Sequence, residues 1–252
     1  STAAERDTEA EILVVSVGVL SGAGGTTDAL SSGTLEAYIG SDAVIDATQS
    51  VSVLAVSLDT TATGDASGGA SIGIAIAIFG TTATVDTVTE ARVDEGARIT
   101  AGSFSLLADV DEEAATDVAT AGIGIGAGAT ADSTAIVEGA STVLIDDNTI
   151  ISTTGDVLVA ATAQRLADAD ADSISGGGIS YGGIQITADV DSSNAASLGN
   201  GVRITAGGNV TIQADSVVET SGVADGGSGA NALALVQLKG VASLSVSDLH
   251  IA

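Results

Sequence analysis

Apolar residues alternate with polar or small residues over long stretches of this 252-residue chain. In the segment 204–214, a short apolar-polar run is followed by two glycines and then by a second run with apolar residues at every other position. A period of two predicts β-strands with one buried face, and paired glycines predict a tight turn. Apolar stripes with helical spacing are absent, whereas glycine and β-branched residues are abundant. We therefore predict an all-β fold.

The strand–turn–strand pattern of this segment recurs at a fixed distance. The first apolar residue after each turn lies 53 residues from the next one, at Val51, Phe104, Val157 and Val210. A fixed long period is typical of repeat architectures. The sequence therefore predicts one continuous repeat array over residues 1–252. Its repeats lie at about 11–66, 67–119, 120–173 and 174–227, with a partial repeat at 228–252. The chain starts and stops out of phase with this period, and we expect it to be a fragment of a longer chain.

Each repeat opens with a run of small residues, such as 70–78 and 121–126, which we predict as strands. A Thr/Asp/Ala-rich strand follows and ends at a polar turn, for example at 94–96 or 146–148. Asp, Asn and Gly favour turns, because their side chains bond nearby backbone or accept positive φ. The spacing of Phe104, Ile123 and Val143 suggests about three faces in each repeat.

Two β-architectures fit these repeats. One is a β-solenoid, similar to a parallel β-helix, whose successive coils stack at the ~4.8 Å spacing of strands in a sheet. The other is a series of antiparallel β modules joined by hairpins. The solenoid is favoured, because the repeats follow one another without a linker, a proline or a change in composition. Stacking would place Asp59, Glu112 and Arg165 in one column, and we expect an exposed ion pair there, contributing about 0–1 kcal/mol.

The charge balance is extreme, with 33 acidic and six basic residues and a net charge of −27. Nucleic acids and anionic membrane surfaces need basic patches, so neither is an expected partner. The chain has no cysteine and therefore no disulfide. Its longest apolar runs, 12–20 and 72–80, are far shorter than the ~20 residues of a membrane-spanning helix, and we expect no membrane insertion in this segment.

The sequences of two segments resemble repeats of large bacterial exoproteins: 99–106 (ITAGSFSL) and 204–212 (ITAGGNVTI). These exoproteins are the filamentous-haemagglutinin-like proteins and giant adhesins. The resemblance implies a right-handed β-solenoid shaft, a location outside the cell or on its outer surface, and work in adhesion, biofilm or matrix formation.

Acidic clusters are the most visible chemistry of the chain. Calcium binds six to eight oxygen ligands and favours adjacent carboxylates on loops, so Asp146, Asp147 and Asn148 form the candidate calcium site. The alternative is a solvated acidic surface, because alternate acids within a strand, as at 168–172, point to one face. The glycine-rich calcium-roll repeat and the EF-hand spacing are both absent.

We predict no catalytic residue and no residue that binds an organic cofactor. The six basic residues are scattered and only four residues are aromatic, so the chain has few groups that could bind the sugar substrate of a polysaccharide-cleaving enzyme. The predicted function is the structural shaft of a large extracellular or cell-surface adhesin or fibre. The alternatives are a calcium-dependent surface- or carbohydrate-binding module and a self-assembling extracellular fibre or sheath subunit. The expected partners are neighbouring repeats and other copies of the chain, by end-to-end or lateral association.

Overall fold

The chain forms a parallel β-solenoid in a computed structural model that describes residues 1–226, 230–246 and 250–251, with side chains described through residue 223. The strands of successive coils are hydrogen-bonded in parallel within three sheets, and the described residues contain no helix. The predictions of an all-β fold and of a solenoid are therefore confirmed, and the antiparallel alternative is wrong.

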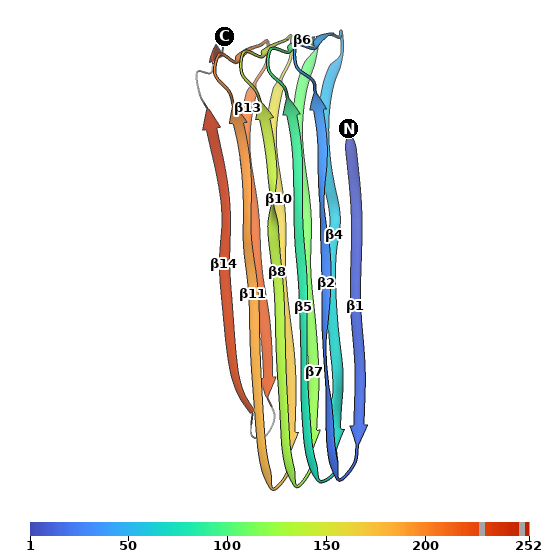
Figure 1. The fold of residues 1–252 in the computed structure, drawn as a ribbon. Helices are drawn as coiled ribbons and strands as arrows, with labels where there is room; N and C mark the ends of the chain where they lie inside the picture. Colours follow the sequence, from blue (N-terminus) through green and yellow to red (C-terminus); the bar gives the residue numbers. More distant parts are fainter. Residues whose placement is uncertain (227–229, 247–249, 252) are drawn as a thin grey trace.

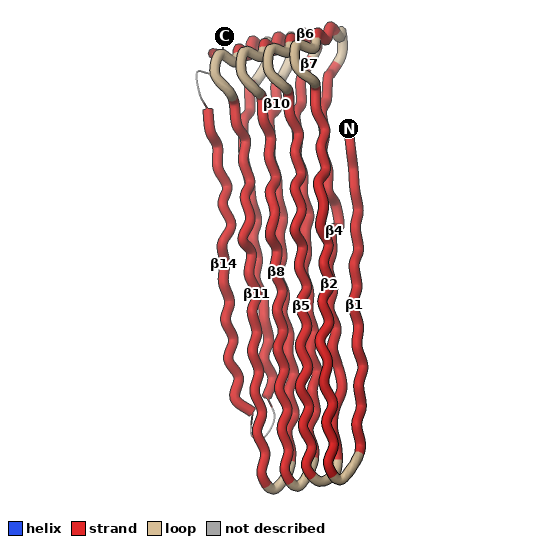
Figure 2. The backbone as a smooth tube through the Cα atoms, viewed as in Figure 1, coloured by secondary structure: helices blue, strands red, loops and turns tan. Residues whose placement is uncertain are grey.

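Each coil consists of two long strands and one short strand (Figures 1 and 2). The first long sheet, sheet A, contains β1 (Thr2–Val17), β4 (Ser50–Ser71), β7 (Ser103–Ile123), β10 (Val157–Gly176) and β13 (Val210–Gly226). The second, sheet B, contains β2 (Leu20–Ile39), β5 (Ile74–Val93), β8 (Gly126–Ile145), β11 (Ile179–Leu198) and β14 (Ala230–Val246). The short sheet C contains β3 (Val44–Asp46), β6 (Arg98–Ala101), β9 (Ile150–Thr153), β12 (Arg203–Ala206) and β15 (His250–Ile251).

The cross-section is long and thin, because sheets A and B face each other along their whole length (Figure 1). At one edge, tight turns at 18–19, 72–73, 124–125 and 177–178 join the two long sheets. We call this the turn edge. At the other edge, sheet C closes the coil, and we call this the short-sheet edge. Every coil thus has two long faces and two narrow edges.

Strand pairing aligns the residues that the sequence pattern aligned. Val51, Phe104, Val157 and Val210 lie opposite one another in successive strands of sheet A. The offset differs elsewhere: Leu20 lies opposite Ile74, and Gly182 lies opposite Ala230. The offset for Leu20 arises at a bulge in β4, between Ser57 and Thr60, and the offset for Gly182 arises between β13 and β14. Length differences between coils are therefore absorbed both by a bulge within a strand and by connections between strands.

The strand predicted at 70–78 is interrupted by the turn at 72–73, and the strand predicted at 121–126 by the turn at 124–125. Isoleucine continues to alternate with glycine or alanine in the sequence through both turns. Ile72 and Ile125, which lie within the turns, are exposed. Periodicity alone therefore could not separate two strands that belong to different sheets. Phe104 and Ile123 also share one strand, β7, so their spacing did not mark two faces, although the number of sheets is three.

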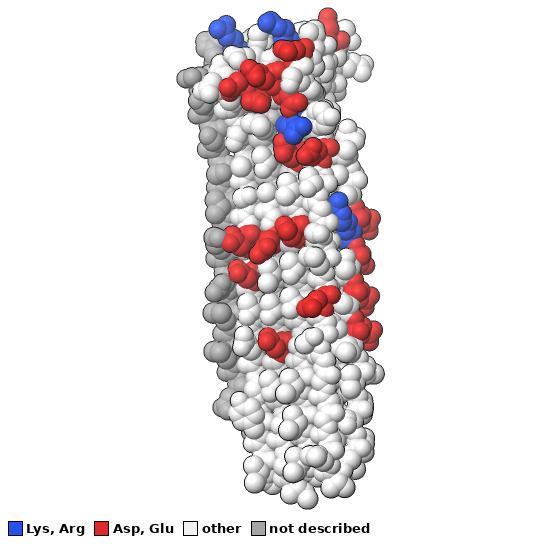
Figure 3. Space-filling model, in the orientation of Figure 1, with Lys and Arg blue, Asp and Glu red and all other residues white. Residues whose placement is uncertain are grey.

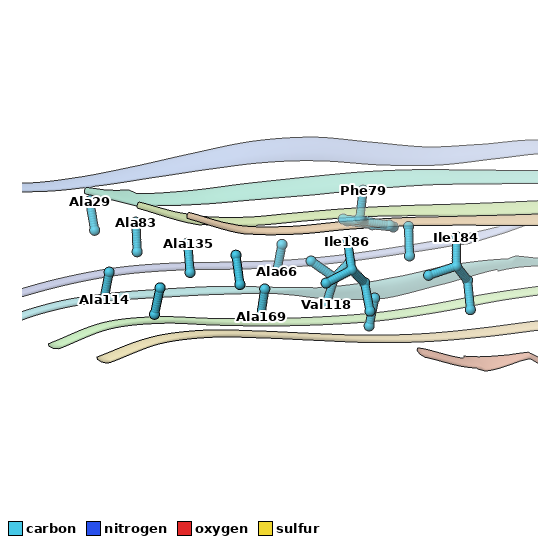
Figure 4. Close-up of a cluster of buried hydrophobic side chains, with 14 of the residues drawn as sticks. Ala29, Ala66, Phe79, Ala83, Ala114, Val118, Ala135, Ala169, Ile184 and Ile186 are labelled. Atoms are coloured by element: carbon cyan, nitrogen blue, oxygen red, sulfur yellow. The ribbon is translucent and has the colours of Figure 1, made fainter. Parts of the chain in front are cut away.

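The interior between the long sheets is thin and is filled mainly by small side chains. Alanine columns from the two sheets face each other, as Figure 4 shows for Ala83 and Ala135 on one side and Ala114 and Ala169 on the other. All four are completely buried. A second apolar cluster lies toward the short-sheet edge and includes Phe104, Leu106 and Ile151. Small residues let the two sheets approach closely, and the few large side chains fill the space that remains.

The turn at 72–73 carries backbone strain. Ile72 has a φ of 76°, a left-handed conformation that is an outlier for a β-branched residue. Its side chain is exposed, so packing does not compensate for the strain. We expect Ile72→Gly to raise the free energy of unfolding by about 1 kcal/mol and the melting temperature by roughly 2–4 °C, as measured by thermal unfolding followed by circular dichroism. Ile74→Gly, in the extended backbone of β5, is the control and should lower stability. A lower melting temperature for Ile72→Gly would contradict the strain.

Candidate functional site: acidic columns and a buried polar belt

The three residues of the candidate calcium site lie in the turn before β9, and their polar atoms bond to backbone and to a neighbouring coil. A carboxylate oxygen of Asp146 accepts a hydrogen bond from the backbone N–H of Asp147 at 2.8 Å. A carboxylate oxygen of Asp147 accepts one from the N–H of Asn200, in the next coil, at 2.6 Å. Nδ2 of Asn148 donates to Glu95 at 3.5 Å. These contacts cap the turns and link adjacent coils.

Asn148 also occupies the left-handed position of its turn, with a φ of 56°. Asp42, Gly96 and Gly201 occupy that position in the other turns of the column. Asn, Asp and Gly tolerate positive φ, which explains the composition of these turns. Asn148 lines a surface recess of about 460 Å³ together with Asp42, Glu95 and Arg98. Arg98 thus places a positively charged side chain at this recess. The residues with described placement include no group of three or more Asp, Glu, His or Cys side chains suited to a metal ion. Calcium binding by residues 146–148 stays a prediction.

Carboxylates stack directly on one another along the outer face of sheet A. Glu11 lies opposite Asp65, Asp65 opposite Asp117, and Asp117 opposite Asp170. Neighbouring strands are ~4.8 Å apart, so each acid lies close to a like charge, which is unfavourable. A second column, Asp86–Glu138–Asp191, crosses the outer face of sheet B. Figure 3 shows acidic side chains arranged in rows across the coils.

Burial and neighbouring charges raise the pKa of several of these acids. The pKa of Asp117 is raised by partial burial and then by Asp65, Asp172 and Asp170. The pKa of Asp111 is raised by partial burial and then by Asp59 and Asp109, and burial raises the pKa of Asp132. Protonation of Asp111 and Asp117 on sheet A therefore removes a partly buried charge and also relieves its repulsion with neighbouring acids.

The ion pair predicted at Glu112 and Arg165 forms, but it is buried, so the expectation of an exposed pair is wrong. Nε of Arg165 donates to a carboxylate oxygen of Glu112 at 2.7 Å, and both side chains have no exposed surface. Thr87 of sheet B donates a hydrogen bond to the other oxygen. Burial raises the pKa of Glu112, because desolvation outweighs the attraction of Arg165 and these hydrogen bonds.

Asp59 does not take part in this column, because β4 bulges at this level. Between Ser57 and Thr60, β4 contains one residue more than β7, and Thr60 lies opposite Glu112. Asp59 has a φ of 51° and points to solvent. The two buried hydroxyls on either side of the bulge, of Ser57 and Thr60, are hydrogen-bonded to each other at 3.0 Å. The bulge thus places a small hydroxyl, rather than a second acid, beside Glu112.

The ion pair belongs to a layer of buried polar residues that crosses the interior between the two apolar clusters. We call this layer the polar belt. Sheet A contributes Ser57, Thr60, Glu112 and Arg165, and sheet B contributes Thr87, Thr89, Ser141, Ser192 and Asn194. Asn194 donates to the backbone carbonyls of Ala161 and Asp215. Nη1 and Nη2 of Arg165 and Oδ1 of Asn194 have no hydrogen-bond partner among the residues that the structure describes. The belt is therefore costly to bury.

The sequence carried a signal for the burial of Glu112 and Arg165. In β7 the buried positions are even-numbered, from Phe104 to Val110, and Glu112 continues that series. In β10 the odd-numbered positions are buried, with Ala160 as an additional buried residue, and Arg165 belongs to the odd-numbered series. The alternation that identified the strands thus also assigned both charges to the interior.

Comparison with models of protein families, with curated proteins and with solved structures finds no match for this chain. The described residues also contain no helix that is long and apolar enough to cross a membrane.

We expect the buried pair to matter far more for stability than the exposed ion pairs. Glu112→Gln leaves Arg165 as a buried cation without a counter-charge and should lower the free energy of unfolding by about 3–5 kcal/mol. Arg92→Ala removes three partly exposed contacts, with Glu36, Glu90 and Asp94, and should cost at most about 1 kcal/mol. Denaturant unfolding measures both. The double variant Glu112→Met/Arg165→Met should recover most of the loss, because no unpaired charge remains. Equal effects of Glu112→Gln and Arg92→Ala would contradict the burial of the pair.

We also expect the solenoid to become more stable as the pH falls from neutral toward the ordinary aspartate value of 3.8. The raised pKa of Asp111, Asp117 and Asp132 means that the folded state binds protons more readily than the unfolded chain in this interval. Stability therefore rises as the pH falls through the raised values and levels off below the ordinary value. Urea midpoints measured across this range test the sign. Asp117→Asn should flatten the dependence, and a midpoint that falls throughout the range would contradict it.

Proposed function

We propose that this chain is a structural shaft segment of a large extracellular or cell-surface bacterial adhesin or fibre, without catalytic activity. The observation that carries the proposal is the continuous parallel stacking of coils in all three sheets. Each coil hydrogen-bonds to its neighbours through long strands, so the body can be extended by adding coils without changing its cross-section. Such an arrangement suits a spacer.

Side chains add contacts between coils that support a rigid rod. Asp156 accepts a hydrogen bond from the backbone N–H of Asn209 at 2.7 Å, and Asp170 accepts one from the N–H of Val223 at 2.9 Å. The contact from Asp147 to Asn200 has the same form. In each case an acid of one coil holds the backbone of the next, and the charge on these acids keeps the flanks soluble.

A calcium-dependent surface- or carbohydrate-binding module is the second candidate. The column Glu11–Asp65–Asp117–Asp170 favours it, because stacked carboxylates supply oxygen ligands for a hard cation. A module of this kind would gain stability when calcium binds, since a ligand that binds only the folded state stabilises it by mass action.

Force spectroscopy of the chain, held at its two ends between identical handle domains, tests the shaft. We expect stepwise unfolding in which each step releases about one coil, or roughly 170 Å of contour for ~50 residues. The step force should be the same in calcium and in excess chelator. A single collapse at low force would overturn the shaft, whereas a step force that rises only with calcium would favour the binding module. Antibodies to this chain should label intact source cells if the proposed location is right.

A further inference from the structure

Large apolar side chains lie on the outer surface along the turn edge. Six of them lie on sheet B, with exposed fractions between 49% and 82%: Leu20, Ile74, Ile76, Ile78, Ile179 and Tyr181. Sheet A and the turns contribute further exposed residues, among them Leu13, Val15 and Val17 of β1 and Ile125. We call this surface the apolar edge. Monomeric proteins rarely expose continuous apolar patches larger than about 300–600 Å², so a surface of this extent indicates an interaction site.

The apolar edge is free of charge, although the chain as a whole carries −27. The segments 12–27, 66–85, 118–131 and 173–188 each contain one turn and the adjoining strand ends, and none contains Asp, Glu, Lys or Arg. On β1 the outward residues change abruptly from Glu9 and Glu11 to Leu13 and Val15. Figure 3 shows the same division, with no charged side chain over the turn edge on the face in view.

On sheet B the apolar edge has alternating ridges and grooves. The isoleucines of β5 form one ridge, and Ile179 and Tyr181 of β11 form the next. The strands beside these ridges carry glycine at most of the facing positions, namely Gly22 and Gly24 on β2 and Gly126 and Gly128 on β8, whereas Leu20 and Thr130 lie opposite the two ends of the β5 ridge. Because ridges and grooves alternate strand by strand, the face is complementary to a copy of itself that is displaced by one strand.

At Gly24 an added Cβ would lie 2.8 Å from the backbone oxygen of Ile78, so the chain's own packing requires glycine there, but it does not at Gly22, Gly126 or Gly128. A Cβ added at Gly126 would meet no atom within 4 Å, and one at Gly22 or Gly128 would meet only a carbonyl oxygen at 4.0 Å. None of the three has positive φ. Glycine inside a strand is unfavourable by roughly 0.5–1 kcal/mol, and such glycines often mark a place where another backbone or a ligand approaches closely.

We propose that the apolar edge of sheet B binds a second copy of this chain, with the isoleucine ridge of β5 seated in the glycine groove of β8 of the partner. The acidic parts of two copies repel each other, so the uncharged edge is where they can meet. Strands that run in opposite directions in the two copies allow the edges to overlap while the acidic parts point away. The six exposed side chains present several hundred Å², the same order as the ~800 Å² that each partner buries in a standard interface. This pairing goes beyond the proposed shaft, since it holds for any role of the rod.

Sedimentation velocity over a wide range of protein and salt concentration tests the pairing. The wild-type chain should associate reversibly, and more strongly at high salt, because salt screens the repulsion between acidic copies. Gly126→Val/Gly128→Val fills the groove and should weaken association by about tenfold or more. Its melting temperature should be unchanged or higher, because the added Cβ atoms meet open space and valine favours strands. Ile76→Lys/Ile78→Lys should abolish association by charging the ridge.

The matched control is Ser32→Lys/Thr34→Lys, which adds the same charges to exposed positions of sheet B outside the apolar edge and should preserve association. Because the chain has no cysteine, Ile76→Cys should form disulfide-linked dimers faster than Ser32→Cys. A chain that stays monomeric at all concentrations overturns the proposal, as does association that is equally strong in the groove and ridge variants. A different outcome would indicate that the apolar edge binds lipid and not a second copy. In that case the chain would bind neutral phosphatidylcholine vesicles without self-association, and the valine variant would bind them at least as well as wild type.

Discussion

The parallel hydrogen-bond ladder between coils is the interaction on which the rest of this structure depends. Each long strand inside the stack bonds to an equivalent strand on either side, so consecutive coils must present their backbones at matched positions. Equivalent side chains then stack in columns, and whatever a column contains is repeated at strand spacing. Alanine columns bring sheets A and B close together, as at Ala83 and Ala135. Acid columns, in contrast, repeat an unfavourable contact, and the outer faces accommodate it because water screens them.

The polar belt shows how the same stacking makes a buried ion pair possible. Glu112 and Arg165 lie opposite each other only in the native register, in which Thr87 of the facing sheet also reaches the carboxylate. A slip by one residue would turn both charges to the outer face and bring outward residues into the apolar interior. We interpret the belt as a device that specifies register at the expense of stability, a role for which buried polar groups have precedent. It also explains why the interior has two apolar clusters instead of one.

The charge of the surface changes across the width of the rod, from the short-sheet edge to the turn edge, and not along the rod axis. The short-sheet edge and the neighbouring parts of both long faces carry the acids, while the turn edge carries exposed isoleucine, leucine and valine. Because the coils with described side chains repeat this division, the apolar edge runs beside an acidic flank along that part of the rod. A rod with one apolar edge and one acidic flank can associate with other surfaces in only a limited number of ways.

The sequence by itself determined the strand content, the inward and outward parity of each strand, and the alignment of Val51, Phe104, Val157 and Val210. These follow from alternation and spacing, which are local properties of the chain. Parity also carried the signal that Glu112 and Arg165 are buried, although the expected ion pair was an exposed one. Only the tertiary structure decided where each coil turns from sheet A to sheet B, because the alternation of apolar residues continues unbroken through Ile72 and Ile125. The meeting of Thr87 with Glu112 and the gathering of isoleucines along one edge depend on those turns. The bulge that moves Asp59 out of its column depends on the pairing of β4 with the strands on either side. A turn between stacked coils is selected by pairing with the coils on either side, and that information is not contained in any single stretch of sequence.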